Sequence, residues 1–386
     1  MKRLFSILIM LLFMSGCSVS KNNLPLETDR VEKGENNSSV VKESASPTVK
    51  AEKREASGKK TEEFFLWCDL DYDIGERLLI FTNLQDEKII KNISVGKRER
   101  IVGTYKVENG FVVVKMKLKK NDNVDNQSDG VAFSFQISEE DVTKYELIFY
   151  DKQLNERKKL DILDLFPKKH KESIINESPI INKTGDIMAW NVDNYIVCFE
   201  FKTKKIRKYD ELLRHDISID MGVIKFVGNN KIGFTGWKDE DGCYGYFNIS
   251  SGELKSFIEN DYDMSDLYTN ARFLCINDGQ DPYTQSSSGR ILILNCITNE
   301  RCSFDVDGIE STMSTVTEDG KYVIAVKRPS DEEFRVRLYD FQTGKKLDEK
   351  IVYNSAPEGI GQFGDTYAVI YATETKKGVA YEIGIE

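Results

Sequence analysis

From Phe64 onward the chain consists of short runs in which hydrophobic and polar residues alternate, each bounded by residues that favour turns. Val, Ile, Phe and Tyr are abundant in these runs. Alternation with a period of two over roughly five to eight residues is the pattern of a β-strand buried on one face. Helical periodicity is confined to short stretches at 161–166 and 210–214. The sequence therefore predicts an all-β body.

One hairpin pattern recurs along this body: a hydrophobic strand ends in Asn, Asp or Glu, a tight turn follows, and a second strand returns. Asn and Asp suit this position because their side chains accept hydrogen bonds from the turn backbone. The intervals between successive copies are 68, 49, 48, 47, 45 and 42 residues. The residues that end the first strand are Asn83, Asp151, Glu200, Asn248, Asn295, Asp340 and Glu382.

A second feature precedes each later hairpin, namely a turn followed by a hydrophobic strand. Each repeat then contains an inner strand, a middle strand and an outer hairpin. A four-stranded unit repeated about every 46 residues is typical of a β-propeller blade. The turns are Thr184-Gly185-Asp186, Gly228-Asn229-Asn230, Asn270, Glu318-Asp319-Gly320 and Gly364-Asp365.

Two of these stretches carry a resemblance to known propellers. TEDGKYVIA from Thr317 and LYDFQTGKKL from Leu338 resemble motifs of TolB-like and WD40-like propellers. The resemblance covers most of residues 180–386 and fades toward 62–140. The Gly-His and Trp-Asp dipeptides of WD40 blades do not occur in this sequence, so the resemblance concerns the architecture. It implies a rigid ring that presents many loops.

The repeat length predicts seven blades. Residues 62–386 number 325, which accommodates seven units of about 46 residues. The one long interval indicates an insertion of about 22 residues in the second unit. We expect it near Lys120 to Asp141, where a polar loop precedes VAFSFQI, a candidate extra strand.

Two points of the architecture stay open at this level. An alternative division makes 62–165 a separate β-sandwich and leaves 166–386 as a partial propeller. Ring closure is also open, because the last copy ends after its third strand. The run Phe64–Cys68 is either the missing outer strand or a strand of the first blade.

The start of the chain has the composition of an export signal. Met1-Lys2-Arg3 is basic, residues 4–14 are hydrophobic except for Ser6, and small residues follow. A basic region, a short hydrophobic region and small residues before a cleavage point are typical of signal peptides. The hydrophobic run is too short for an ordinary membrane-spanning helix, which needs about 20 residues.

The end of this signal is similar to the lipobox of bacterial lipoproteins. Met14-Ser15-Gly16-Cys17 carries the resemblance, although that family prefers Leu where Met14 stands. The resemblance implies cleavage before Cys17 and a diacylglyceryl lipid on its thiol, with acyl chains such as palmitate. Two or three acyl chains hold a protein at a membrane far better than one. An ordinary signal peptide is the alternative.

Residues 18–61 have the composition of a tether. They contain no aromatic residue, nine Lys or Arg and seven Asp or Glu. Such a segment buries too little hydrophobic surface to offset chain entropy, so we expect disorder. As a flexible coil its 44 residues span about 35–40 Å r.m.s.. The expected organisation is a signal peptide at 1–16, a lipidated cysteine with tether at 17–61, and a propeller at 62–386.

Charge and histidine content narrow the function. The formal charge is −10 overall and −14 for residues 62–386, which argues against nucleic-acid binding. The two histidines, His170 and His215, are both expected at the surface, which limits His-based metal sites and acid–base catalysis. GxSxG, HExxH and Walker motifs are absent from the sequence. The sequence leans against an enzyme and predicts no cofactor beyond the lipid.

Cysteines and acidic residues supply the remaining candidate sites. Cys296 and Cys302 flank one hairpin turn and form either a disulfide or two small buried side chains. Asp69, Asp71 and Asp73 alternate in a spacing that occurs at the start of calcium-binding loops. A solvated strand end explains these carboxylates as well. The other cysteines of the body are expected in the core; they are Cys68, Cys198, Cys243 and Cys275.

These features together predict a lipoprotein anchored to the cell membrane on its extracytoplasmic side. Its partners are the membrane, through the lipid, and an envelope protein, peptide or glycan bound by the propeller. One alternative is a surface hydrolase or lyase that cleaves polysaccharide or peptidoglycan with paired carboxylates. Another is a sensor or assembly factor beside an envelope complex.

Overall fold

The computed structural model places all of its described residues in one compact unit, Lys50–Glu386; Met1–Val49 forms the other unit and lies outside the description. In the described ranges, no helix is long and hydrophobic enough to cross a membrane. The described residues are 66–73, 76–83, 88–119, 137–219, 223–259, 264–278, 290–306, 311–330, 333–353, 356–363, 366–372 and 378–383.

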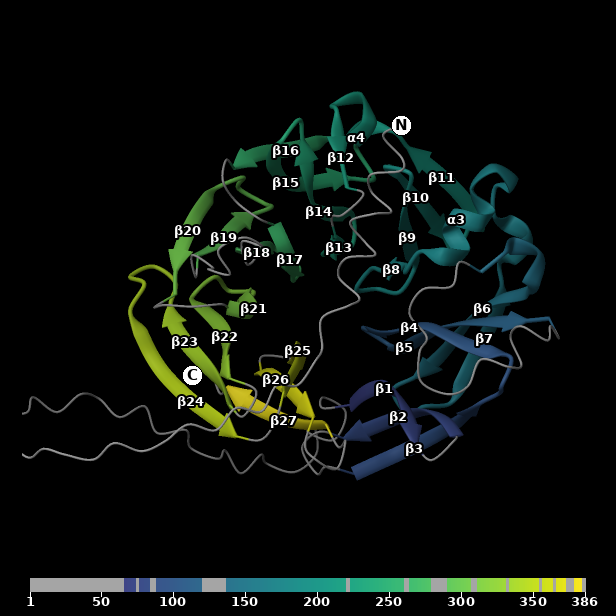
Figure 1. Cartoon of the computed structure of the whole chain (residues 1–386), viewed down its shortest axis with the longest axis horizontal. Helices are drawn as coiled ribbons and strands as arrows, with labels where there is room; N and C mark the ends of the chain where they lie inside the picture. The colour runs from purple at the N-terminus through teal and green to yellow at the C-terminus, as the bar shows by residue number, and fades with distance from the viewer. Residues whose placement is uncertain are drawn as a thin grey trace, which may run out of the picture. The chain divides into compact units, whose positions relative to one another are not determined.

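The described strands form seven antiparallel sheets, numbered here 1 to 7 in chain order, which follow one another around a ring in Figure 1. Sheet 1 contains β1 (Leu66–Asp73), β2 (Glu76–Asn83) and β3 (Lys88–Val95). Sheet 2 contains β4 (Glu99–Val107), β5 (Gly110–Leu118), β6 (Val142–Asp151) and β7 (Glu156–Asp161). Sheet 3 contains β8 (Ile180–Ile181), β9 (Ile187–Val192), β10 (Tyr195–Glu200) and β11 (Lys205–Tyr209).

Sheet 4 has the first strand of its repeat in two short pieces, because both β12 and β13 pair with β14. Sheet 4 contains β12 (Ile217–Ser218), β13 (Ile224–Val227), β14 (Lys231–Lys238), β15 (Asp241–Asn248) and β16 (Leu254–Glu259), and sheet 5 contains β17 (Met264–Thr269), β18 (Phe273–Asp278), β19 (Arg290–Asn295) and β20 (Arg301–Asp305). Sheet 6 contains β21 (Ser311–Val316), β22 (Tyr322–Ser330), β23 (Glu333–Asp340) and β24 (Lys346–Tyr353). Sheet 7 contains β25 (Ala356–Phe363), β26 (Thr366–Ala372) and β27 (Gly378–Ile383).

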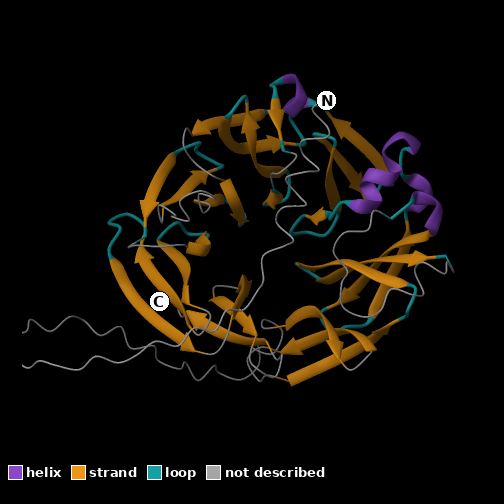
Figure 2. Cartoon of the chain, viewed as in Figure 1, coloured by secondary structure: helices purple, strands orange, loops and turns teal. Residues whose placement is uncertain are grey.

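Helical segments are short and occupy connections between strands (Figure 2). The predicted stretches at 161–166 and 210–214 contain η2 and α4, so both expectations are confirmed. The described helical segments are η1 (Glu139–Asp141), η2 (Leu163–Leu165), η3 (Lys168–His170), α3 (Lys171–Asn176) and α4 (Glu211–Arg214).

Spatial order follows chain order within the sheets, as the repeat pattern predicts. Sheet 2 runs β4-β5-β6-β7, and sheets 3, 5 and 6 have the same order from first to fourth strand. In Figure 1 the first strands lie toward the centre and the fourth strands lie outside. The all-β and β-propeller predictions are thus confirmed, whereas the blade number stays a prediction.

The two ends of the body differ from the four-stranded repeat. Leu66–Asp73 pairs with β2 along its whole length, from Leu66 opposite Asn83 to Asp73 opposite Glu76. This strand therefore belongs to the first sheet, which decides between the two roles that the sequence left open. Within the described strands, β27 pairs with β26 alone.

The long repeat interval lies where the sequence places it. β5 and β6 pair from Gly110 opposite Asp151 to Leu118 opposite Val142, so the connection between these two strands takes up residues 119–141. Residues 120–136, which include the candidate extra strand VAFSFQI, lie outside the described part of the chain.

Hydrophobic clusters join each described sheet to the next. The cluster between sheets 2 and 3 contains Trp190, which lies 5.6 Å from Phe166 and 6.5 Å from Tyr145 between ring centroids. Tyr145 and Trp190 are both 0% exposed. This core extends across residue 165, where the alternative division would separate two domains. The domain boundaries themselves stay predictions.

Candidate binding face

The antiparallel order gives each sheet two different ends. Connections from first to second and from third to fourth strand meet at one end, which we call the turn face. Connections from second to third strand, and links to the next sheet, meet at the opposite end, which we call the loop face. Hydrogen bonds between neighbouring turns show that equivalent ends of sheets 2 to 7 lie together.

The polar residue that ends each third strand stabilises the turn face. In sheets 2 to 6 its side chain accepts a hydrogen bond within its own turn, as the sequence predicts. Asp340 Oδ1, for example, accepts from the Thr343 N–H and from Thr343 Oγ1, each at 2.7 Å. The other acceptors are Asp151 from Asn155, Glu200 from Thr203, Asn248 from Ser250 and Asn295 from Ile297.

A backbone hydrogen bond then couples the two turns of each of sheets 3 to 6. The residue after the polar position donates its N–H to a carbonyl in the first turn of the same sheet. The four bonds, 2.8 or 2.9 Å long, are Phe201 to Asp186, Ile249 to Asn230, Cys296 to Arg272 and Phe341 to Lys321.

Further hydrogen bonds join the turns of consecutive sheets into a belt. Each link between sheets 2 and 7 has at least one such bond. They run from Glu108 N to Lys183 O, Asn182 Nδ2 to Asn229 O, Gly228 N to Asn270 O, Asn270 Nδ2 to Val316 O, and Glu318 N to Tyr367 Oη.

An ion pair adds a link between two sheets that are not neighbours. Lys183 Nζ of sheet 3 lies 3.0 Å from Glu318 Oε1 of sheet 6. Both residues belong to the belt of turns, so the inner turns of these two sheets approach each other closely. The turn face is therefore a cross-linked framework of short turns.

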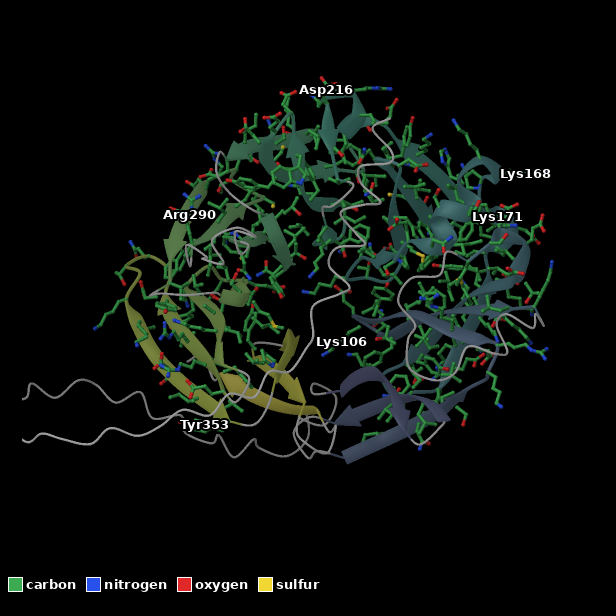
Figure 3. The ribbon with its side chains drawn as sticks, viewed as in Figure 1. Lys106, Lys168, Lys171, Asp216, Arg290 and Tyr353 are labelled. Carbon is green, nitrogen blue, oxygen red and sulfur yellow. The ribbon has the colours of Figure 1, made fainter. Side chains whose placement is uncertain are left out.

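The loop face carries the longer connections. Residues 119–141, 162–179 and 210–223 connect strands there, and together they contain every helical segment of the described chain (Figure 2). Figure 3 shows Lys168 and Lys171 beside α3 and Asp216 beside α4. Loops held on a rigid scaffold are where binding residues usually gather. We therefore take the loop face of sheets 2 to 4 as the candidate binding face.

His170 lies within this face and corrects one expectation. It ends η3 with only 6% of its surface exposed, although its polar neighbours in the sequence predict a surface position. Its Nε2 is 3.0 Å from Lys208 Nζ, which in turn lies 3.3 Å from the centre of the Tyr195 ring. Its Nδ1 is 3.7 Å from Asp193 Oδ2.

The neighbours of His170 favour its neutral form. Burial lowers its pKa, and the charges of Lys208 and Lys169 lower it further, while Asp193 acts in the opposite direction. Lys208 can only donate, so Nε2 accepts its hydrogen bond and the imidazole proton resides on Nδ1. His170 therefore holds the α3 segment against sheet 3. His215 is exposed, as expected.

Five cysteines of the described chain have free thiols in this structure, and the disulfide between Cys296 and Cys302 stays a prediction; the five are Cys198, Cys243, Cys275, Cys296 and Cys302. Cys302 pairs across the hairpin with Ile293, whereas Cys296 follows the end of β19. Cys296 is 1% exposed, but Cys302 is on the surface. Cys198, Cys243 and Cys275 are buried, as predicted.

Two predicted sites cannot be placed with side chains. Asp69, Asp71 and Asp73 lie at alternate positions of β1, and their side chains are outside the described structure, so the calcium site stays a prediction. Elsewhere, the described side chains contain no group of three His, Cys, Asp or Glu that would hold a metal ion. Cys17 is likewise outside the described residues.

Comparisons with known proteins agree with this architecture. No family model and no curated protein matches the sequence. A chain in the crystal structure of the mitotic checkpoint complex aligns with a TM-score of 0.50 at 8% identity, over 84% of this chain and 86% of that chain. The C-terminal WD40 domain of Sif2 aligns with a TM-score of 0.44 at 14% identity, over 81% and 76%. Together with the ring of antiparallel sheets, the first of these likenesses concerns the fold alone: the chain has a β-propeller fold.

Proposed function

We propose that this protein is a lipid-anchored binding module of the cell envelope. In this proposal Cys17 carries the lipid, residues 18–61 act as the tether, and the propeller binds an envelope protein, peptide or glycan on the extracytoplasmic side. The lipobox resemblance of residues 14–17 supports the anchor. A tether of this composition lets the propeller search a shell of roughly 35–40 Å around its anchor.

The contrast between the two faces of the propeller carries the binding role. The turn face consists of short turns that are hydrogen-bonded within sheets and between sheets. The loop face of sheets 2 to 4 has the long connections and the helical segments η1, η2, η3, α3 and α4. A hydrogen-bonded framework of turns that holds the loops in place lowers the entropy lost when a partner binds. The partner should therefore contact the loop face.

Fractionation of cells tests the anchor. We expect Cys17→Ser to move the protein from the membrane fraction to the soluble fraction or the medium, because no acyl chains would then be attached. Ser18→Ala is the matched control and should stay with the membrane. Membrane retention of the Cys17→Ser chain would contradict lipid anchoring without bearing on the binding face.

Photo-crosslinking in intact cells tests the binding face. A photoreactive residue at exposed Lys168 or Arg214 lies on the loop face, whereas the same residue at exposed Lys202 or Lys345 lies on the turn face. We expect a discrete protein or glycan adduct from the first two positions and none from the controls. Equal adducts from both pairs, or adducts from the turn face alone, would refute the assignment.

A further inference from the structure

Basic residues are concentrated in one part of this acidic protein. Residues 88–119 contain nine Lys or Arg and two Asp or Glu, a net charge of +7 in a chain of net charge −10. This segment comprises β3, β4 and β5, the outer strand of sheet 1 and the first two strands of sheet 2. The sheet positions of these residues determine whether the charge is dispersed or gathered.

Strand pairing gathers lysines at the loop-face end of sheet 2. Lys115 is paired with Glu146 and Lys117 with Lys144, between the end of β5 and the start of β6. Lys159 of β7 is paired with Ile148, two positions along the same face of β6. Because paired residues share a face of a sheet, these four lysines belong to one face. We call Lys115, Lys117, Lys144 and Lys159 the lysine cluster.

Two carboxylates lie beneath the lysine cluster. Glu146, 4% exposed, has carboxylate oxygens 3.2 Å from Lys159 Nζ, 3.7 Å from Lys144 Nζ and 3.9 Å from Lys115 Nζ. Glu99 accepts a hydrogen bond from Lys115 at 2.7 Å. Partial burial raises the pKa of Glu99, but the hydrogen bonds from Lys115 and Gly96 outweigh it and hold that pKa below its ordinary value. Both carboxylates are already engaged, so this set of four lysines and two glutamates keeps two positive charges in excess.

The excess charge is on the surface. The side chains of Lys144 and Lys159 are 49% and 42% exposed, and Lys117 is exposed as well. Lys117 and Lys144 stand directly opposite each other, an arrangement of like charges that destabilises an isolated sheet. Exposed Lys97, Arg100 and Lys119 flank the same strand ends. The acidic residues of η1, Glu139 to Asp141, lie there as well and offset part of this positive charge. An anionic surface placed against this end would relieve the repulsion.

We propose that the lysine cluster is a contact surface for an anionic phospholipid membrane. The four cations are all lysines, whose compact, mobile charges suit diffuse headgroup charge better than the bidentate carboxylate pairing that arginine favours. The proposal rests on the proposed lipid anchor, which would keep the propeller within reach of the bilayer at high effective concentration. Without such a patch, a body of net charge −14 would be repelled by anionic lipid.

Lysine labelling on vesicles tests this contact. The full lipidated chain is reconstituted into phosphatidylcholine vesicles with or without phosphatidylglycerol, and lysine acylation is mapped by mass spectrometry. We expect Lys117 and Lys144 to react roughly threefold more slowly on the anionic vesicles, with the difference lost in high salt. Lys202 and Lys345, on the turn face, should react equally on both. Equal reactivity of the cluster on both vesicles would overturn the proposal.

Charge reversal separates the cluster from the anchor. In the full lipidated chain on phosphatidylglycerol vesicles, Lys117→Glu combined with Lys144→Glu should raise the acylation rates of Lys115 and Lys159, whereas Lys202→Glu combined with Lys345→Glu should leave these rates less affected. An anchor failure would show as a wild-type chain that does not float with phosphatidylcholine vesicles. Failure of the cluster would show as acylation rates that do not depend on which lysine pair is reversed, in a chain that does float with phosphatidylcholine vesicles.

Discussion

At the scale of single residues, His170 shows how environment overrides local sequence. A run of Lys and Glu around it indicates exposure, yet η3 and sheet 3 enclose it. Its Nε2 accepts a hydrogen bond from Lys208, so protonation of the ring would place two cations 3.0 Å apart. Lys169 adds repulsion, and Asp193 only partly offsets it.

The lowered pKa of His170 makes stability depend on pH. As pH falls below about 6.5, the unfolded chain takes up a proton that the folded protein resists, so the free energy of unfolding should fall. Above that pH the contribution of His170 is fully present. Urea unfolding at about pH 7.5 and about pH 5.5 measures the change. His170→Gln should reduce this slope, and an unchanged slope would contradict the assignment.

The thiols are a second property of individual residues. Burial raises the pKa of Cys198, Cys275 and Cys296 to about 12 and that of Cys243 to about 11. Cys302 is on the surface, although partial burial raises its pKa too. Access to reagent therefore separates Cys302 from the four buried thiols.

Alkylation of the native protein should follow that order. Among these five cysteines, N-ethylmaleimide should modify Cys302 first, and the other four should react only on unfolding. Peptide mapping by mass spectrometry measures the order. A disulfide-linked peptide pair containing Cys296 and Cys302 in the unreduced sample would show that these two thiols are oxidised in the protein.

At the scale of elements, the hairpin turns carry local information. Asp340 ends β23 and accepts two hydrogen bonds from Thr343, one from backbone and one from side chain. Gly344 in the same turn has a φ of 68°, a conformation that side chains rarely adopt. The turn is therefore determined by a few neighbouring residues, which is why sequence alone locates it.

Removing the Asp340 side chain should weaken sheet 6. We expect Asp340→Ala to lower the free energy of unfolding by about 1–2 kcal/mol, because two hydrogen bonds in the turn are lost. Asp340→Asn keeps an acceptor oxygen and should recover most of that loss. Denaturant titration of the three proteins measures both values, and equal stability of all three would exclude the capping role.

Short helices are not always predictable from the local pattern of hydrophobic residues. α4 follows a recognisable stretch, but α3 spans only six residues and has no hydrophobic stripe that repeats. Its Ile174 and Ile175 are 0% and 1% exposed because they join the core between sheets 2 and 3. A helix this short is stabilised by tertiary packing, so sequence periodicity does not reveal it.

At the scale of the whole molecule, stability depends on the hydrophobic cores that neighbouring sheets share. Trp190 of sheet 3 is 0% exposed and belongs to the cluster that also contains Tyr145 of sheet 2. If sheets 2 and 3 share one core, a destabilising substitution in the core of sheet 3 should also destabilise sheet 2. If 62–165 folded as a separate sandwich, the same substitution would destabilise sheet 3 and leave sheet 2 unchanged.

Trp190→Ala distinguishes these outcomes. The substitution should lower the free energy of unfolding by about 3–5 kcal/mol, as expected for a fully buried aromatic ring. Hydrogen exchange should increase in both β5–β6 and β9–β10. Half-buried Trp237 provides the matched control, and Trp237→Ala should cost less and spare sheet 2. Unchanged exchange in β5–β6 would favour the separate sandwich.

The strand repeat, the turn residues, the position of the long second-to-third connection and the propeller architecture can all be predicted from the sequence. These features follow from alternation and turn chemistry, which act within a few residues. The folded structure was needed to show that Leu66–Asp73 belongs to the first sheet, that His170 is buried and that Cys296 is buried whereas Cys302 is on the surface. It also gathered lysines from β5, β6 and β7 around Glu146. Contacts of this kind depend on strand register and sheet packing between distant segments, which periodicity does not encode.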